Sequence, residues 1–197
     1  MEGNSPDEGN GGASKSGIFL LRQFLQDPKV ASLKSTSPYL VRRICRRLDL
    51  RGPRVIVELG PGLGCFSRAL LDRLSPDSTL ILIETNPDFA NALARIPEPR
   101  LRVVFGSAVH LKDILRHAGL SRVDVVLSGI PFSYHKEAAK MKLLEDIREV
   151  LSEDGIFVAY QSTAHLRKYL KRVFPRVRVE RQVFHIPYLV VLEARAA

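Results

Sequence analysis

Val55-Ile-Val-Glu-Leu-Gly-Pro-Gly-Leu-Gly-Cys-Phe66 is the stretch of sequence from which the fold can be predicted. Its β-branched and apolar residues end at Glu58, a glycine-rich turn follows, and from Phe66 onward apolar residues recur with helical spacing. A strand, a tight loop and a helix in this order form the opening unit of a nucleotide-binding α/β domain. Gly60 and Gly62 carry no Cβ, so the backbone can turn sharply there and come close to a ligand.

The spacing of the glycines and of two acids narrows the kind of ligand. In the dinucleotide-binding fingerprint, G-x-G-x-x-G, the third glycine would fall at Cys65, whereas here it is Gly64. Glu58 precedes the first glycine by two residues, and Glu84 ends the next apolar run twenty residues after Gly64. A carboxylate at that place can accept hydrogen bonds from both hydroxyls of a ribose. The loop and Glu84 together predict a nucleoside-containing ligand, with an ordinary glycine turn and a solvent-facing acid as the simpler alternative.

Beyond this loop, apolar strands and amphipathic helices alternate along the chain. Strands are expected at residues 55–58, 79–83, 101–105, 123–128, 156–160, 177–179 and 188–193, and helices at 66–74, 87–95, 111–118 and 136–151. Such alternation is typical of a sheet whose strands are mostly parallel. The sequence therefore predicts a Rossmann-like α/β domain over residues 51–197, with a seven-stranded, mostly parallel sheet and helices on both faces.

Two further segments are expected before this domain. Residues 1–17 consist mainly of Gly, Ser, Asn and acids and predict a disordered tail. Residues 18–50 predict an amphipathic, basic helical segment. Its second helix would begin at Ser37 and Pro38, because serine caps helices and proline fits their first turn. That helix would bury one apolar face and present four arginines on the other: Arg42, Arg43, Arg46 and Arg47.

The charge of the chain is basic and unevenly distributed. The formal net charge is +9, and residues 15–54 carry ten Lys and Arg against two acids, while residues 165–197 carry eight against two. Such clusters indicate a polyanionic partner, nucleic acid or an anionic membrane, although a solvated surface has the same composition. No apolar stretch approaches the ~18 residues of a membrane-spanning helix, and no secretory signal is recognisable. Cys45 and Cys65 lack metal-ligand spacing, so the cytosol is expected and no metal site is.

Four motifs in succession resemble those of class I S-adenosylmethionine-dependent methyltransferases, over residues 55 to 160. They are Glu58-Leu-Gly-Pro-Gly-Leu-Gly64, Glu84, Gly106-Ser-Ala108 and Ser128-Gly-Ile-Pro-Phe132. More narrowly, residues 24–32, 106–108, 128–133 and 159–161 resemble bacterial phospholipid N-methyltransferases, which methylate phosphatidylethanolamine towards phosphatidylcholine. Their relatives, the ribosomal RNA adenine dimethyltransferases, are the main alternative.

The resemblance implies S-adenosyl-L-methionine as cofactor and S-adenosyl-L-homocysteine as product. The residues expected to bind the cofactor are Glu58, Gly60, Gly62, Gly64, Glu84, Thr85, Gly106, Ser107, Ala108 and Ser128. The substrate amine would be oriented, or relieved of a proton, by residues of the entrance helix and of the strand ends. The candidates for that role are Tyr39, Gly129, Ile130, Pro131, Tyr134, His135 and Tyr160.

The residues after the fourth strand separate the lipid enzymes from the RNA enzymes. RNA adenine dimethyltransferases carry Asn-Leu-Pro-Tyr or a close variant there, in which the Asn accepts a hydrogen bond from the adenine amine. This chain has Gly129-Ile-Pro-Phe132, and glycine offers no side-chain acceptor. The chain also stops just after its last expected strand, where the RNA enzymes continue with a helical domain, and Ser107 replaces an adenine-binding Asp of many relatives, as in the lipid family.

These observations favour methyl transfer to the amine head group of phosphatidylethanolamine at a membrane surface. The partners expected are an anionic membrane and the lipid itself; nucleic acid is not favoured, and no obligate protein partner is expected. The expected location is the cytoplasm, peripherally attached to the inner face of the membrane. An RNA adenine N-methyltransferase is the alternative enzyme, and a binding module that has lost catalysis is the alternative without an enzymatic role.

Overall fold

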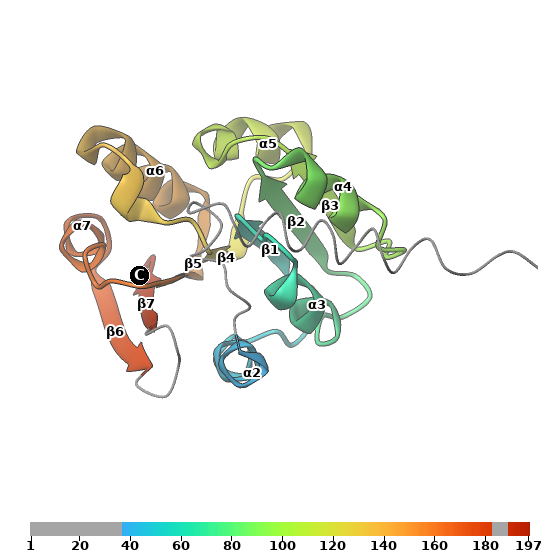
Figure 1. The fold of residues 1–197 in the computed structure, drawn as a ribbon, viewed down its shortest axis with the longest axis horizontal. Coiled ribbons are helices and arrows are strands. Elements are labelled where there is room, and N and C mark those ends of the chain that lie inside the picture. Colours follow the sequence, from blue (N-terminus) through green and yellow to red (C-terminus); the bar gives the residue numbers. More distant parts are fainter. Residues whose placement is uncertain (1–36, 183–188) are drawn as a thin grey trace, which may run out of the picture. The chain divides into compact units, whose positions relative to one another are not determined.

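The structure, a computed structural model, describes residues 37–182 and 189–197 (Figure 1). The expected tail at residues 1–17 and the first part of the expected basic helical segment, residues 18–36, lie outside the described residues. Residues 35–197 form one compact unit, and the description that follows concerns this unit alone.

The core of this unit is a seven-stranded sheet in which one strand, the last in the chain, runs opposite to the other six. The strand order is β3-β2-β1-β4-β5-β7-β6, and the strands from β1 to β5 pair in parallel. β7 lies between β5 and β6 and runs antiparallel to both. The predicted fold, seven mostly parallel strands, is confirmed. The bounds are β1 (Val55–Leu59), β2 (Thr79–Glu84), β3 (Leu101–Phe105), β4 (Val123–Ser128), β5 (Leu151–Gln161), β6 (Arg176–Gln182) and β7 (Leu189–Arg195).

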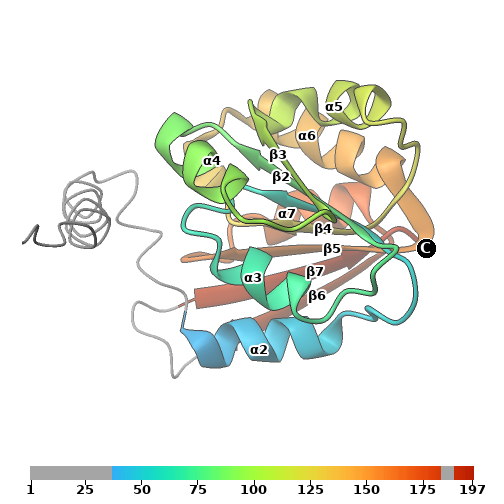
Figure 2. The same cartoon turned by 90° about the vertical axis from the view of Figure 1, so that its right-hand side faces the viewer.

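Helices cover both faces of the sheet, also as predicted (Figure 2). Apolar side chains of α2, α3 and α4 pack with alternate residues of the central strands in one cluster, and those of α5, α6 and α7 pack on the other face in a second cluster. This division follows from the pleat, because successive side chains of a strand point to opposite faces. The bounds are α2 (Pro38–Arg47), α3 (Cys65–Leu71), α4 (Pro87–Ala94), α5 (Leu111–His117), α6 (Glu137–Val150) and α7 (Arg167–Val173).

The register of the strands brings three loops to one edge of the sheet. Leu59, the last residue of β1, pairs with Ile83 of β2 on one side and with Ser128 of β4 on the other. The loops that follow these strands therefore leave the same carboxyl edge, where open α/β sheets bind their ligands.

α2 begins where the sequence predicted and packs its apolar face into the core. The Ser37 hydroxyl accepts a hydrogen bond from the Leu40 N–H at 3.3 Å, and Pro38 occupies the first turn. The arginine face is divided between two environments. Arg43 and Arg47 pair with Glu180 of β6, and Arg47 also pairs with Glu193 of β7 at 2.8 Å. The other two, Arg42 and Arg46, are exposed and have no ion pair within the described residues.

Candidate functional site

The glycine loop between β1 and α3 has the backbone that its sequence requires. Gly60, Gly62 and Gly64 all have positive φ, at 68°, 55° and 74°. Side chains rarely tolerate this left-handed region, so glycine is favoured at each of the three positions. The Gly60 N–H donates to the Ile83 carbonyl at 2.9 Å, which fixes the start of the loop beside the end of β2.

Glu84 joins the second strand to this loop. It is buried; its Oε2 accepts a hydrogen bond from the Gly62 N–H at 3.0 Å, and its Oε1 accepts one from the Asn86 N–H at 2.9 Å. Each carboxylate oxygen has a second lone pair, so both can still accept from ligand hydroxyls. The structure thus brings together the glycine loop and the acid that the sequence paired by spacing; Thr85, the next residue, is exposed.

Glu58 lies fully buried beneath the loop with one oxygen unsatisfied. Its Oε2 accepts a hydrogen bond from the Ser67 hydroxyl at 2.6 Å, whereas Oε1 has no partner among the described residues. Burial raises the pKa of Glu58 to about 7, the hydrogen bond from Ser67 opposes this rise, and the charge of Glu84 adds to it. A buried oxygen without a donor marks a place for a ligand that supplies one.

Ser67 is a site residue that the sequence analysis did not identify. It is fully buried in α3, whose inner face is otherwise apolar, with Phe66 and Leu70 beside it. A small hydroxyl residue on an apolar helix face, three positions after Gly64, was the available signal. Its partner could not be inferred, because that depends on the side chain's direction in the folded molecule.

The motif after β3 lies next to Glu84. The Gly106 N–H donates to the Glu84 carbonyl at 2.9 Å, and Ala108 is buried. The Ser107 hydroxyl accepts from the Val109 N–H at 3.4 Å, so it caps the short turn that follows. Gly106, Ser107 and Ala108 therefore border the same carboxyl edge as the glycine loop.

The loop after β4 contacts the glycine loop closely. The Gly129 N–H donates to the Leu59 carbonyl at 2.9 Å, and the buried Ser128 hydroxyl accepts from the Ile130 N–H at 3.3 Å. A Cβ on Gly60 would lie 3.3 Å from Ile130 Cγ1. The backbone from Ser128 to Pro131 is therefore placed beside the predicted cofactor loop, where its carbonyl groups could accept from an amine.

Tyr160, near the end of β5, packs against Phe66 of α3. Its side chain is buried, and its ring centre lies 4.5 Å from that of Phe66. Burial, with a smaller contribution from the charge of Glu58, raises the pKa of Tyr160 well above its usual value. The hydroxyl therefore stays protonated at neutral pH and cannot act as a base there.

The structure does not bring the other candidates for orienting the substrate amine, Tyr39, Tyr134 and His135, together with Glu58 and Tyr160. Tyr39 and Tyr134 are 66% and 75% exposed, and no described contact joins either of them to Glu58 or Tyr160. His135 is half-buried, and its Nδ1 is buried without a partner among the described residues. Roles for these three side chains remain predictions.

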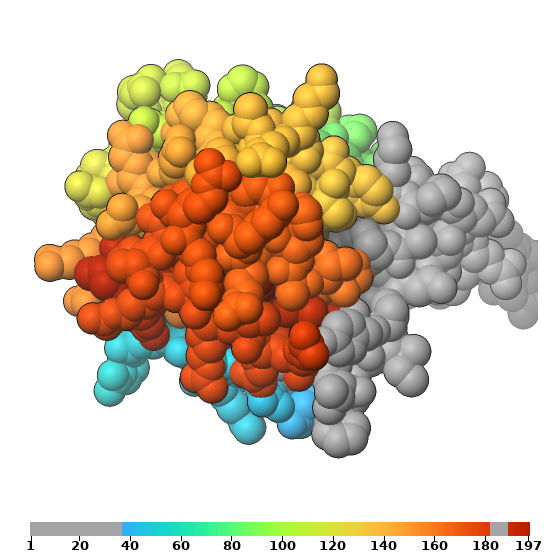
Figure 3. Space-filling model, turned by 90° about the vertical axis from the view of Figure 1, so that its left-hand side faces the viewer, coloured from blue at the N-terminus to red at the C-terminus, as the bar shows by residue number. Residues whose placement is uncertain are grey.

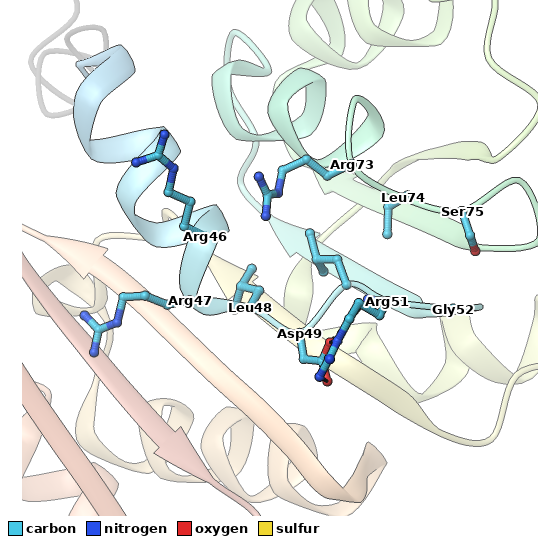
Figure 4. A pocket seen from close by; sticks show the side chains of 10 residues that line it. Arg46, Arg47, Leu48, Asp49, Arg51, Gly52, Arg73, Leu74 and Ser75 are labelled. Atoms are coloured by element: carbon cyan, nitrogen blue, oxygen red, sulfur yellow. Dashed lines mark hydrogen bonds and ion pairs between the residues drawn. The ribbon is translucent and has the colours of Figure 1, made fainter.

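A cavity of about 850 Å³ lies at the opposite edge of the sheet, between the end of α2 and the loop after α3. In Figure 4, Arg46 and Arg73 border this cavity, while Arg51 folds back to donate to Asp49 at 2.8 Å. Because it adjoins the amino end of β1, this cavity is not part of the site at the carboxyl edge.

The described residues hold neither a metal site nor a membrane-spanning helix. No group of three or more His, Cys, Asp or Glu side chains in residues 37–182 and 189–197 is placed to hold a metal ion. In the same part of the chain, no helix has the length and apolar character needed to cross a membrane.

The chain matches one protein-family model and several curated methyltransferases. The family model of the TrkA-N domain matches residues 61–177, which places this segment in that domain family. An ornithine lipid N-methyltransferase of Singulisphaera acidiphila is 34% identical over 142 residues, which cover 71% of this chain and 74% of that protein. A ribosomal RNA small subunit methyltransferase A of Streptomyces avermitilis is 37% identical over 81 residues, only 38% of this chain and 26% of that protein.

Two solved structures of methyltransferases illustrate the similarity of the fold. An N-methyltransferase of Burkholderia thailandensis, solved with 1,6-didemethyltoxoflavin and S-adenosylhomocysteine, has a TM-score of 0.62 and 20% identity, covering 97% of this chain and 93% of that one. An S-adenosylmethionine-dependent O-methyltransferase of Thermotoga maritima has a TM-score of 0.65 and 16% identity, covering 83% and 67%. At these identities the likeness concerns the fold.

The residues at the carboxyl edge fit S-adenosylmethionine. The unsatisfied oxygen of Glu58 can accept from a ligand ammonium group, and the two oxygens of Glu84 can accept from ribose hydroxyls. The TrkA-N match begins at residue 61 and therefore does not include Glu58. The match to the ornithine lipid N-methyltransferase covers 74% of that enzyme's length. By the identity and extent of its match to that relative, the chain belongs to the bacterial lipid N-methyltransferases, and its fold is that of S-adenosylmethionine-dependent methyltransferases.

Proposed function

We propose that this methyltransferase acts on the primary amine of a membrane lipid head group, with phosphatidylethanolamine and ornithine lipid as the candidate substrates. The observation that carries the proposal is the packing around Gly129, where a Cβ would lie 2.5 Å from the Tyr160 hydroxyl oxygen. The asparagine with which RNA adenine dimethyltransferases accept a hydrogen bond from adenine has no room there. The relative that acts on an ornithine lipid supports the same choice.

The bound cofactor supplies a methyl group on a sulfonium, and the protein's task is to hold the acceptor nitrogen in line with it. Backbone carbonyl groups of Gly129 and Ile130 are the acceptors closest in sequence to the end of β4, and they can orient an amine through its N–H groups. The hydrogen bond from the Ile130 N–H to Ser128 fixes the direction of this turn. Glu58 and Glu84 bind rather than react, since both lie under the glycine loop.

Access to a lipid requires contact with a membrane surface, and the location we propose is the cytoplasmic face, with peripheral attachment. Arg42 and Arg46 project from α2 into solvent, and neither pairs with a carboxylate within the described residues. Each basic residue near an anionic surface contributes about 1 kcal/mol to attachment. Arg43 and Arg47 are less available for this, because Glu180 and Glu193 hold them.

The test is transfer of a labelled methyl group from S-adenosylmethionine by the purified full chain. Separate reactions contain vesicles with phosphatidylethanolamine, with ornithine lipid, with phosphatidylcholine only, or ribosomal RNA without vesicles. Label in one of the amine-bearing lipids, and none in phosphatidylcholine, is expected. Label in RNA with none in any lipid would overturn the proposal in favour of an RNA adenine methyltransferase.

A further inference from the structure

The contact between α6 and α7 contains a buried cation without a matching carboxylate. Lys140, in the first turn of α6, is only 4% exposed. Its ammonium group donates to His165 Nε2 at 3.3 Å and lies 4.7 Å from the centre of the Tyr169 ring. Within the described residues Lys140 has no ion pair, although lysines are almost never fully buried unless paired.

The carboxylate nearest along α6 is engaged elsewhere. Glu137, one turn before Lys140, accepts a hydrogen bond from the Tyr169 hydroxyl on Oε2 at 3.3 Å. Its Oε1 pairs with Arg172 at 3.1 Å. The negative charge of Glu137 is therefore directed to α7, and donors of the Lys140 ammonium remain for another acceptor.

A second lysine lies against the same aromatic ring. Lys168 Nζ is 4.8 Å from the centre of the Tyr169 ring, and its side chain is exposed. The ammonium of Lys140 can only donate, so His165 must accept on Nε2 and carry its proton on Nδ1. The two ammonium groups beside one ring are cationic donors of the kind that bind an oxyanion, and His165 holds one of them in place.

This cluster lies in the elements that follow β4 and β5 along the chain. α6 follows β4 through the loop that contains Gly129, and His165 lies in the connection that leaves the end of β5. Both connections start from the carboxyl edge of the sheet. α6 and α7 lie side by side on one face, which Figure 3 views from outside.

We propose that the ammonium groups of Lys140 and Lys168 bind the anionic group of the lipid whose amine is methylated, with His165 holding the Lys140 side chain in place. This inference rests on the proposed function. The ligand is an oxyanion carried on the same head group as a primary amine, and the phosphodiester of phosphatidylethanolamine and the carboxylate of an ornithine lipid both have this chemistry. Such a site would exclude amines that carry no anion, and it would orient the head group with its amine towards the loop after β4.

Binding is tested without catalysis by titrating the full chain with glycerophosphoethanolamine and following the histidine ring signals by NMR. The His165 signal, assigned from a His165→Gln variant, is expected to shift in the parent protein and in Lys171→Met. Lys171 is an exposed cation of α7 and serves as the matched control. In Lys140→Met the shift is expected to disappear. A parent signal that does not move overturns the inference.

Kinetics test the same site with vesicles that contain phosphatidylethanolamine, ornithine lipid or a long-chain alkylamine. Lys140→Met and Lys168→Met are expected to raise KM for the anionic lipid by about tenfold or more, since each removes a hydrogen bond to a charged group. Their affinity for S-adenosylhomocysteine should not change, which also shows that they fold. The lipid whose KM rises more identifies phosphate or carboxylate as the group recognised, and KM for the alkylamine should stay constant.

The two failures can be told apart. If a lipid is methylated but neither variant differs from Lys171→Met in KM, the inference is overturned and the proposed function stands. If no lipid is methylated while the His165 signal still shifts in the parent and not in Lys140→Met, the anion site stands and the proposed function fails. Lys168 is exposed, so its variant keeps the test valid even if Lys140→Met does not fold.

Discussion

The hydroxyl group of Tyr160 takes the space that a side chain at position 129 would need. An ideal Cβ on Gly129 would lie 2.5 Å from the Tyr160 hydroxyl oxygen, 2.9 Å from its Cζ atom and 2.9 Å from the Gly60 carbonyl oxygen. Two of these three obstacles belong to one buried ring and the third to the glycine loop. The absence of a side-chain acceptor at this position is therefore supported by the packing of two other segments.

Gly129→Ala is expected to destabilise the protein by about 1–3 kcal/mol, because overpacking forces neighbouring groups to shift. Thermal unfolding and the affinity for S-adenosylhomocysteine would measure the change. In the Tyr160→Phe background the hydroxyl contact is gone, while the contacts with Cζ and with the Gly60 carbonyl remain. The second substitution should thus restore only part of the loss, and an alanine variant as stable as the parent would contradict the packing described.

Glu84→Ala should weaken cofactor binding by about 1.5–3 kcal/mol, the usual range for hydrogen bonds to a charged group. The loss has two sources, the ribose contacts and the hydrogen bond that Glu84 accepts from the Gly62 N–H. Glu84→Gln keeps one acceptor oxygen and should lose less. Calorimetry with S-adenosylhomocysteine distinguishes the variants, and equal affinity in all three proteins would remove Glu84 from the site.

The buried carboxyl of Glu58 predicts a dependence of stability on pH. Its pKa of about 7 in the folded protein lies above the usual value of 4.5. The folded state then holds a proton that the unfolded state releases, so this contribution is complete below pH 4.5 and is lost as pH rises through 7. The loss is roughly 3 kcal/mol at 1.36 kcal/mol per pKa unit. Urea unfolding between pH 4.5 and 8 should show this slope in the parent and a flatter one in Glu58→Gln; the same slope in both would contradict the assignment.

The two halves of the arginine face should behave differently when neutralised. Arg42→Gln with Arg46→Gln is expected to reduce flotation with anionic vesicles and to leave the unfolding temperature unchanged. Arg43→Gln with Arg47→Gln is the matched pair on the same helix, and it should lower the unfolding temperature because it breaks the pairs with Glu180 and Glu193. If the variant with Arg42→Gln and Arg46→Gln binds vesicles as well as the parent does, these two arginines are not the anchor. Both effects should shrink at high salt, where the Debye length falls to ~3 Å.

Those parts of the fold and site that depend on local pattern could be predicted from the sequence. The glycine loop, the acid at Glu84 and the cap at Ser37 each follow from residues within a single turn or strand end, and the structure has all three. The central strands could be predicted because buried strands are continuous apolar runs, and β6 because its apolar and charged residues alternate.

Features that depend on contacts between distant residues could not be predicted. Arg43 pairs with Glu180, 137 positions away, so the helical wheel showed a basic face but not which of its charges are neutralised. The hydrogen bond between Ser67 and Glu58 requires the direction of one helix against one strand. The burial of Lys140 could not be predicted either, since it results from the packing of α7 against α6.

The place of β7 has a consequence for how the chain acquires its fold. This last strand is interior, and it pairs with β5 on one side and β6 on the other. As the chain emerges from the ribosome, β1 to β5 can pair in parallel, but β6 has no partner in the sheet until residues 189–195 have been made. Synthesis proceeds from the N-terminus, so the strands from β1 to β5 are available for pairing before β7 has been made. The half of the sheet that carries the glycine loop can therefore pair first, and the half that holds α2 through Glu180 and Glu193 must pair after it.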